Sequence, residues 1–221
     1  MTEIRNAATI VLIRKKGGSN FVLMGQRLPT IAFMPRKYVF PGGVWERSDN
    51  DVPVSKTINN REKNFLGLET NFVESPNLGI TAIRELWEET GLRLSCSGNF
   101  DSFPSSWKEF FSEGQGPNLS SLNFFFRAIT PPGRIRRFDA RFFFCDARYI
   151  ADDLDDFSKA SGELSPLKWV EISQAKTLNL PKITFIALEH LMTIIKSDFK
   201  YHNIPFYFES SDGFMEKQLR L

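Results

Sequence analysis

Three glutamates crowd one face of a predicted helix in the segment AIRELWEETGL, residues 82–92. At about 100° per residue, the apolar residues of this segment fall on one side, and Glu85, Glu88 and Glu89 fall on the other. Like charges three or four residues apart oppose helix formation by roughly 0.2–0.5 kcal/mol per pair. Arg84, four residues before Glu88, relieves only part of this repulsion. The pattern indicates that another group gathers these carboxylates.

A divalent cation bound with a phosphate is the group that fits this pattern. Mg²⁺ prefers oxygen ligands and is often shared with substrate phosphates. The sequence also contains PGG at residues 41–43, directly after the predicted strand KYVF. Consecutive glycines let backbone amides and carbonyls approach an ion or a phosphate without obstruction by a Cβ atom. The two motifs together predict metal-assisted phosphate chemistry, and the alternative is a solvated acidic helix face beside an ordinary turn.

The combination of FPGG and RELWEETGL resembles the box of the Nudix hydrolases. That box is a glycine, five residues, a glutamate, seven residues, and then Arg-Glu-aliphatic-any-Glu-Glu-any-Gly-aliphatic. The seven fixed positions of its second half are all matched, by Arg84, Glu85, Leu86, Glu88, Glu89, Gly91 and Leu92. Gly43 matches the opening glycine but lies 41 residues before Arg84, so about 27 residues, at about 50–76, are inserted inside the box.

The middle glutamate of the box has two candidate positions because of this insertion. Counted forward from Gly43 its place is taken by Asp49, and counted back from Arg84 it is taken by Pro76. Glu46 stands where many Nudix proteins also carry an acid. We expect Glu46 and Asp49 to lie behind the residues that contact metal and substrate.

The resemblance also implies roles for individual residues. The substrate would be a nucleoside diphosphate linked to another moiety, which water attacks with the help of Mg²⁺ or Mn²⁺. Glu88 and Glu89 are the first candidates for metal ligands, joined by Glu85 and Gly43. Arg84 is expected to orient the glutamates. The general base is either Glu85 or a loop carboxylate, for which Glu163 in GELSPLKWVEISQA is the candidate.

A narrower resemblance concerns the substrate. The insertion, the FMP upstream of it and the RRFDARFFF downstream are similar to an animal Nudix subgroup associated with coenzyme A and acyl-CoA diphosphatase activity. Another coenzyme A group carries an Arg-x3-Gly pattern before its FPGG, and here those positions are Ala32 and Arg36. Two alternatives stay open: a nucleotide-sugar or dinucleotide diphosphatase acting on ADP-ribose or NADH, and a Nudix domain that senses a nucleotide without cleaving it. The intact glutamates argue against the sensor.

Selection of coenzyme A would require a positive group that binds its 3′-phosphate and an apolar surface that contacts its pantetheine arm. The arginines of GRIRRFDAR supply candidates for the first, Arg134, Arg136 and Arg137, and Phe33 and Met34 supply candidates for the second. The alternative for the arginines is a solvated strand edge. The phenylalanine runs at 124–126 and 142–144 are expected to pack in the sheet core, since aromatic residues favour strands.

The elements that position these residues follow from hydrophobic patterning. Strands are predicted at ATIVLIRK and FVLMGQR, joined by the turn KGGSN, and then at KYVF, LNFFFRAI, ARFFFCDA and, as the last strand, LKWVEIS. Helices are predicted at about 79–90, ending at Gly91, and at 180–197. Residues 46–79 are polar and loop-like. The fold class predicted is α/β (α+β), with the α/β/α sandwich and mixed sheet of the Nudix fold, in a single domain over 1–221.

Composition limits the partners. The chain has 221 residues and a formal net charge of +2, too small to argue for nucleic acid or for a membrane surface. No apolar run is long enough for a signal segment or a membrane span, so we expect a cytoplasmic protein. Cys96 and Cys145 are expected to be buried thiols. The expected partner is a small nucleoside diphosphate substrate, and the oligomeric state stays open, with a homodimer as one alternative.

Overall fold

A nine-stranded mixed sheet forms the centre of the computed structural model, which describes residues 2–30, 34–210 and 213–221. Its order is β11-β10-β7-β8-β1-β2-β3, with β4 also paired to β1 and β9 to β2. The pairs β1–β8 and β7–β10 are parallel and the others antiparallel. The strands are β1 (Ile4–Lys16), β2 (Ser19–Arg27), β3 (Tyr38–Val39), β4 (Gly42–Val44), β7 (Asn123–Ile129), β8 (Arg137–Asp146), β9 (Leu164–Glu171), β10 (Ile204–Ser210) and β11 (Gly213–Leu219).

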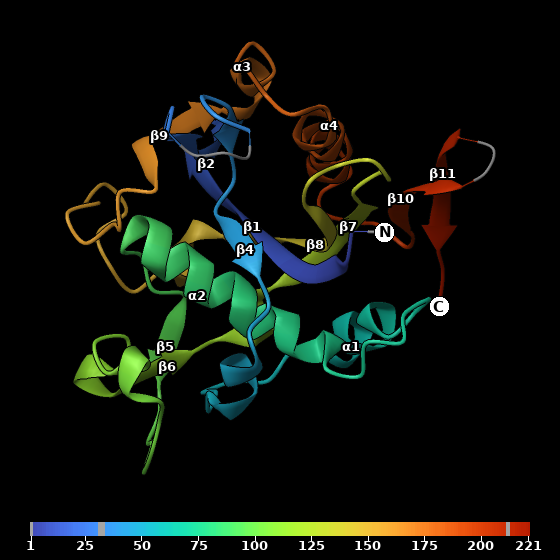
Figure 1. Cartoon of the computed structure of the whole chain (residues 1–221). Helices are drawn as coiled ribbons and strands as arrows, with labels where there is room; N and C mark the ends of the chain where they lie inside the picture. The colour runs from blue at the N-terminus through green and yellow to red at the C-terminus, as the bar shows by residue number, and fades with distance from the viewer. Residues whose placement is uncertain (1, 31–33, 211–212) are drawn as a thin grey trace.

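Helices cover both faces of the sheet (Figure 1). The α-helices are α1 (Asn60–Leu66), α2 (Leu78–Thr90), α3 (Ile172–Ala175) and α4 (Lys182–Lys196), and a separate ribbon pairs β5 (Ser95–Ser97) with β6 (Gln115–Pro117). Along β1, Ile10 and Leu12 join the core under α2, whereas Val11 and Ile13 join the core under α4. This alternation follows from the two-residue period of a strand. The predicted α/β/α sandwich with a mixed sheet is confirmed.

Several local predictions are confirmed. The β1–β2 hairpin pairs Lys16 with Ser19, and Gly17 and Gly18 take φ angles of 57° and 83°, which glycine adopts without strain. The phenylalanines of both predicted strands are buried in the two cores. Cys145 is buried as expected, but Cys96 is only partly buried, because β5 lies on the two-stranded ribbon outside the main sheet.

Two predictions about elements are wrong. β9 is not the last strand, because the C-terminal segment forms β10 and β11, and β10 extends the sheet beside β7. The strand β3 ends at Val39, before PGG, and Gly42 and Gly43 begin the further strand β4, where they pair with Thr9 and Ala8 of β1. Residues 46–79 contain the helix α1. Each of these elements is short and draws its stability from tertiary partners, so its own sequence pattern is weak.

The inserted segment packs into the core. Val52, Phe65 and Leu66 are buried in the same core as α2, which a surface loop would not show. Glu62 of α1 is also buried, and its Oε2 accepts a hydrogen bond from the backbone N–H of Phe124 at 2.8 Å. α1 is therefore fixed to the start of β7. No described helix is long and apolar enough to cross a bilayer.

A buried charge cluster ties this segment to the sheet. Arg127 and Arg141 both pair with Asp139, with N–O distances of 2.7 and 3.1 Å. Arg127 also donates to the carbonyls of Leu68 and Glu69 at 3.0 and 3.1 Å. We call Arg127, Asp139 and Arg141 the anchor cluster. Through these hydrogen bonds Arg127 holds residues 68–69, just after α1, against the sheet.

Candidate active site

The predicted acidic helix is the helix α2 of the structure. It ends at Thr90, and Gly91 follows with a φ of 79°, the left-handed conformation that favours glycine at a helix end. Its apolar residues, among them Ile83 and Leu86, are fully buried against the sheet. This burial fixes the rotation of the helix. The polar face with Glu85, Glu88 and Glu89 is consequently turned toward β4 and β9.

Arg84 lies at the centre of these carboxylates. Its Nη1 donates to Glu85 Oε1 at 2.8 Å and to Glu88 Oε2 at 3.3 Å. Its Nε donates to Asp49 Oδ1 at 2.8 Å, and its Nη2 donates to the Val44 carbonyl at 2.8 Å. Burial alone lowers the pKa of Arg84, but the hydrogen bond to Asp49 and the surrounding charges outweigh it and raise the pKa above its usual range. The guanidinium stays charged and holds α2, β4 and the inserted segment together.

Asp49 reaches this site from the start of the inserted segment. Its side chain is buried, and its Oδ2 also accepts hydrogen bonds from Thr81 Oγ1 at 2.8 Å and from the Glu46 backbone N–H at 3.1 Å. Of the two candidate positions for the middle acid of the box, the one that contacts Arg84 is thus Asp49. Pro76 lies in a 3-10 turn, Ser75–Asn77, before α2. Thr81 was not identified from the sequence, although its place three residues before Arg84 puts it on the same helix face.

The two glycines of β4 bring backbone close to the glutamates. The Gly42 N–H donates to Glu89 Oε2 at 2.9 Å. A Cβ atom at position 43 would lie 2.3 Å from Glu85 Oε1, so only glycine leaves room for this carboxylate. At position 42 a Cβ atom would meet the Ala8 carbonyl oxygen at 2.6 Å. Both glycines are therefore required by close packing rather than by an unusual backbone conformation.

Burial and mutual repulsion perturb the carboxyl groups. Desolvation, with the charge of Glu88 adding to it, raises the pKa of Glu85 to about 7. Desolvation and the charge of Glu85 raise the pKa of Glu89 to about 8. The pKa of Glu88 is raised as well, mainly by burial. Arg84 pairs with three carboxyl groups, and the charge of Arg27 acts on Glu89, so carboxyl groups outnumber arginines here. A bound cation would relieve this excess of negative charge.

Glu163 approaches the same group from the loop before β9. It is exposed, and its charge helps to raise the pKa of both Glu85 and Glu89. Glu46 is also exposed, and its charge acts on Glu88. The structure thus gathers carboxyl groups from three parts of the chain around one end of α2.

The donor set fits a hard divalent cation. Carboxylate oxygens are the ligands that Mg²⁺ and Mn²⁺ take, and Glu85 and Glu89 are buried carboxyl groups whose ionised forms are disfavoured without a cation. Within the described part of the chain, no group of three acidic, histidine or cysteine side chains already has the spacing of a metal site. Arg84 accounts for part of this, since it draws Glu85 and Glu88 toward itself.

The predicted substrate arginines lie at the turn between β7 and β8. Arg134 and Arg136 are exposed, and neither makes a hydrogen bond or ion pair with any residue that the structure describes. Arg137 is half-buried, and its Nε donates to the Thr130 carbonyl at 2.9 Å. No contact joins these three side chains to the described glutamates. Phe33 lies outside the described residues, and Met34 is half-buried.

Comparison with known proteins tests the resemblance. No family model matches the sequence. The crystal structure of a NUDIX hydrolase from Alicyclobacillus acidocaldarius superposes with a TM-score of 0.66 at 26% identity, and the match covers 87% of this chain and 93% of that one. This chain has the Nudix fold.

A sequence relative points the same way. The chain is 28% identical over 182 residues to a Caenorhabditis elegans protein named as nudix hydrolase 7, and the match covers 76% of this chain. It spans about half the length of that relative, 51%. A more distant structure is the NUDIX domain of Shewanella oneidensis NrtR complexed with ADP ribose. It is 11% identical with a TM-score of 0.48, and the match covers 88% of this chain and 90% of that one. Together the first two matches support a relationship to the Nudix hydrolases.

Proposed function

We propose that this protein is a Mg²⁺- or Mn²⁺-dependent hydrolase that cleaves the diphosphate bond of a nucleoside diphosphate linked to another moiety. The observation that carries the proposal is the excess of carboxyl groups around Arg84, beside a glycine strand that gives backbone access to them. Carboxyl groups that outnumber the arginines beside them, and whose pKa values are raised, are suited to hold a cation for phosphate chemistry. The fold shared with a NUDIX hydrolase and the intact second half of the box support the same conclusion.

The residues that would hold the cation are Glu85, Glu88 and Glu89, together with the backbone at Gly43. When bound, the ion neutralises charge that develops on the phosphate oxygens and lowers the pKa of a coordinated water. Arg84 keeps Glu85 and Glu88 in place, and Asp49 keeps Arg84 in place through a buried ion pair. Glu85 and Glu163 are the candidates for accepting a proton from the attacking water. Glu85 is fixed by Arg84, whereas Glu163 is exposed on a loop.

The two candidate bases predict different pH–rate profiles. If Glu163 takes the proton, Glu163→Gln lowers kcat and removes the acidic limb of the kcat profile, while metal affinity stays near that of the wild type. If Glu85 is the base, Glu163→Gln leaves the acidic limb in place. Metal affinity measured by Mn²⁺ electron paramagnetic resonance separates loss of a ligand from loss of a base.

The test of the activity is a hydrolysis panel with products identified by mass spectrometry. Coenzyme A, ADP-ribose, NADH, dinucleoside polyphosphates and nucleoside triphosphates are incubated with and without Mg²⁺ or Mn²⁺. We expect metal-dependent cleavage of a diphosphate bond, and a loss of about a hundredfold or more in kcat for Glu88→Gln. Lys63→Gln, an exposed change on α1, is the matched control. If none of these substrates is cleaved in the presence of Mg²⁺ or Mn²⁺, the alternative of a Nudix domain that senses a nucleotide without cleaving it is favoured.

Coenzyme A or acyl-CoA is the leading substrate within this proposal. The support is the sequence resemblance to the coenzyme A subgroup and two exposed arginines, Arg134 and Arg136, which are free for the 3′-phosphate. We expect 3′,5′-ADP and 4′-phosphopantetheine as products and poorer cleavage of dephospho-coenzyme A, which lacks the 3′-phosphate. Changing both arginines to Ala is expected to reduce that preference. Better cleavage of ADP-ribose or NADH than of coenzyme A would instead support the alternative diphosphatase.

A further inference from the structure

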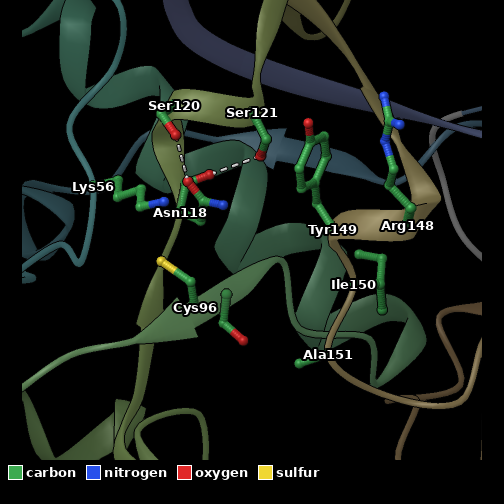
Figure 2. A pocket seen from close by; sticks show the side chains of 10 residues that line it. Lys56, Cys96, Asn118, Ser120, Ser121, Arg148, Tyr149, Ile150 and Ala151 are labelled. Carbon is green, nitrogen blue, oxygen red and sulfur yellow. Dashed lines mark hydrogen bonds between the residues drawn. The ribbon is translucent and has the colours of Figure 1, made fainter.

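A pocket lies where four segments of the chain meet, and none of the carboxyl groups around Arg84 lines it. Its volume is about 410 Å³. One wall comes from the inserted segment at Lys56, one from β5 at Cys96, one from the turn after β6 at Asn118, and one from the turn after β8 at Tyr149 (Figure 2). A pocket of roughly 300–1,000 Å³ accommodates a small organic ligand.

Backbone hydrogen bonds between these segments hold the pocket open. The Leu119 N–H donates to the Lys56 carbonyl at 2.9 Å, and the Asn118 N–H donates to the Leu94 carbonyl at 3.1 Å. The Ala151 N–H donates to the Arg93 carbonyl at 3.0 Å. Because neighbouring walls are linked in this way, the pocket is formed before any ligand arrives.

One end of the pocket carries two side-chain donors, the exposed Lys56 ammonium and the Asn118 amide, that have no acceptor among the described residues. Figure 2 shows the Lys56 side chain directed toward Asn118 and Cys96, across the pocket. The Lys56 ammonium makes no hydrogen bond or ion pair with any described residue. Asn118 is buried, and its Oδ1 accepts from Ser120 Oγ at 2.8 Å, while its Nδ2 donates to no residue described in the structure. An ammonium and an amide N–H₂ facing the same space call for an anionic acceptor.

The charged side chains around the pocket also favour an anionic ligand. No acidic side chain lines it. Arg148 also lines it, but its guanidinium pairs with Asp146 at 3.2 Å and lies over the Tyr149 ring at 5.2 Å. Lys56 is thus the cation that remains available. Tyr149 and Ile150 give the pocket an apolar wall across from Lys56 (Figure 2).

We propose that this pocket binds a small phosphorylated molecule with a planar ring, of the nucleoside monophosphate class, at a site separate from the carboxylates of α2. The phosphate accepts hydrogen bonds from Lys56 and from the Asn118 amide, and the ring packs on Tyr149. A phosphate suits this end of the pocket because its three terminal oxygens accept from several donors at once. The inserted segment then has a definite role, since it provides the cation of the site. This inference does not depend on the proposed hydrolysis.

The experiment is isothermal titration of the full chain with adenosine monophosphate, and separately with inorganic phosphate, in the presence of a metal chelator. Neither probe contains a diphosphate bond, so turnover plays no part. We expect adenosine monophosphate to bind, and Lys56→Gln to weaken its binding at least about tenfold, as expected for loss of a charge-assisted hydrogen bond. Tyr149→Ala is expected to weaken binding of adenosine monophosphate but not of phosphate. Binding of phosphate as tight as that of the nucleotide would overturn the role given to the ring.

Matched variants separate this site from the carboxylates. Lys63→Gln, which removes an exposed lysine of the same inserted segment outside this pocket, is expected to leave binding unchanged. Thermal unfolding of each variant checks that the fold is kept. The proposal is overturned if neither probe binds at millimolar concentration, or if binding survives Lys56→Gln and is lost in Glu88→Gln. Failure of the hydrolysis panel would leave this result untouched.

Discussion

Two buried clusters in this molecule combine arginine with carboxylate, and they differ in the sign of the surplus charge. The anchor cluster has two arginines and one aspartate, whereas Arg84 pairs with three carboxyl groups and Glu89 lies beside them. In the anchor cluster, neutral groups receive the extra donors: Arg141 donates to Asn6 Oδ1 at 2.7 Å and to Thr70 Oγ1 at 3.1 Å. Within the anchor cluster, as far as the structure describes it, the Arg141 Nε is the one buried nitrogen without a partner.

The consequences for the titratable groups are opposite. Burial lowers the pKa of Arg141 to about 10, which still leaves it charged at neutral pH. Burial raises the pKa of Glu85 and Glu89 into the neutral range. In the anchor cluster every arginine nitrogen except the Arg141 Nε has an acceptor, so this cluster serves as structure. A carboxylate cluster whose ionised form is disfavoured supports the proposed cation site.

The largest expected effect breaks the anchor cluster. Asp139→Asn leaves two buried arginines without a carboxylate, and we expect the free energy of unfolding to fall by about 3–5 kcal/mol. Urea denaturation measures it. Arg141→Met is the matched variant, because it leaves Arg127 and Asp139 as a neutral pair and is expected to cost less. If both changes cost the same, the balance of charge is not what stabilises this cluster.

The corresponding change at the carboxylates is expected to act on turnover instead. Glu89→Gln keeps the shape of the side chain and an oxygen for the Gly42 N–H, but it removes a ligand charge. We expect kcat to fall about a hundredfold or more, and stability of the metal-free protein near pH 8 to stay equal or rise. Steady-state kinetics and thermal unfolding in a chelator measure the two effects. A large loss of stability with near-normal kcat would make this cluster structural, like the anchor cluster.

A smaller effect is expected from the glycine beside Glu85. Gly43→Ala places a Cβ atom where the Glu85 carboxylate lies, so this side chain must move, and we expect kcat to fall about tenfold. Stability should change less than in Gly42→Ala, because the obstructing group is the end of a side chain rather than backbone. Gly42→Ala is the contrast: its Cβ meets the backbone of Ala8 and Thr9, so the loss should appear in urea denaturation. If Gly43→Ala and Gly42→Ala change kcat and stability to the same extent, the two glycines do not have these separate roles.

The smallest effect expected is a dependence of stability on pH. Without metal, the folded-state pKa values of about 7 for Glu85 and about 8 for Glu89 lie above the unfolded value of about 4.3. The folded chain therefore holds more protons between about pH 4.3 and 8, and stability falls as the pH rises through this window. Bound Mg²⁺ favours the ionised carboxylates, so its stabilising effect should grow with pH.

Melting temperatures with and without Mg²⁺ at about pH 6 and about pH 8.5 test this. We expect the shift caused by Mg²⁺ to be larger by a few degrees at the higher pH. The double variant Glu85→Gln and Glu89→Gln should lose most of that difference. A shift that is independent of pH would show that the metal does not bind at these groups.

The sequence by itself determined which carboxyl groups share one face of α2 and the main layers of the fold. Glu85, Glu88 and Glu89 are spaced so that the helix period alone brings them to one face, and the β-branched, apolar run ATIVLIRK predicts the strand β1. These are local periodicities, so they can be read without knowing any partner. The same reasoning identified Gly91 as the end of α2.

Only the tertiary structure decided the contacts between distant segments. Asp49 and Arg84 are 35 residues apart, and the sequence left Asp49 and Pro76 as equal candidates until folding placed Asp49 against the guanidinium. The strands β10 and β11, the helix α1 and the pocket at Lys56 depend in the same way on partners far along the chain. Their own residues carry weak patterns because their stability comes from those partners, and long-range packing has no periodic signature in sequence.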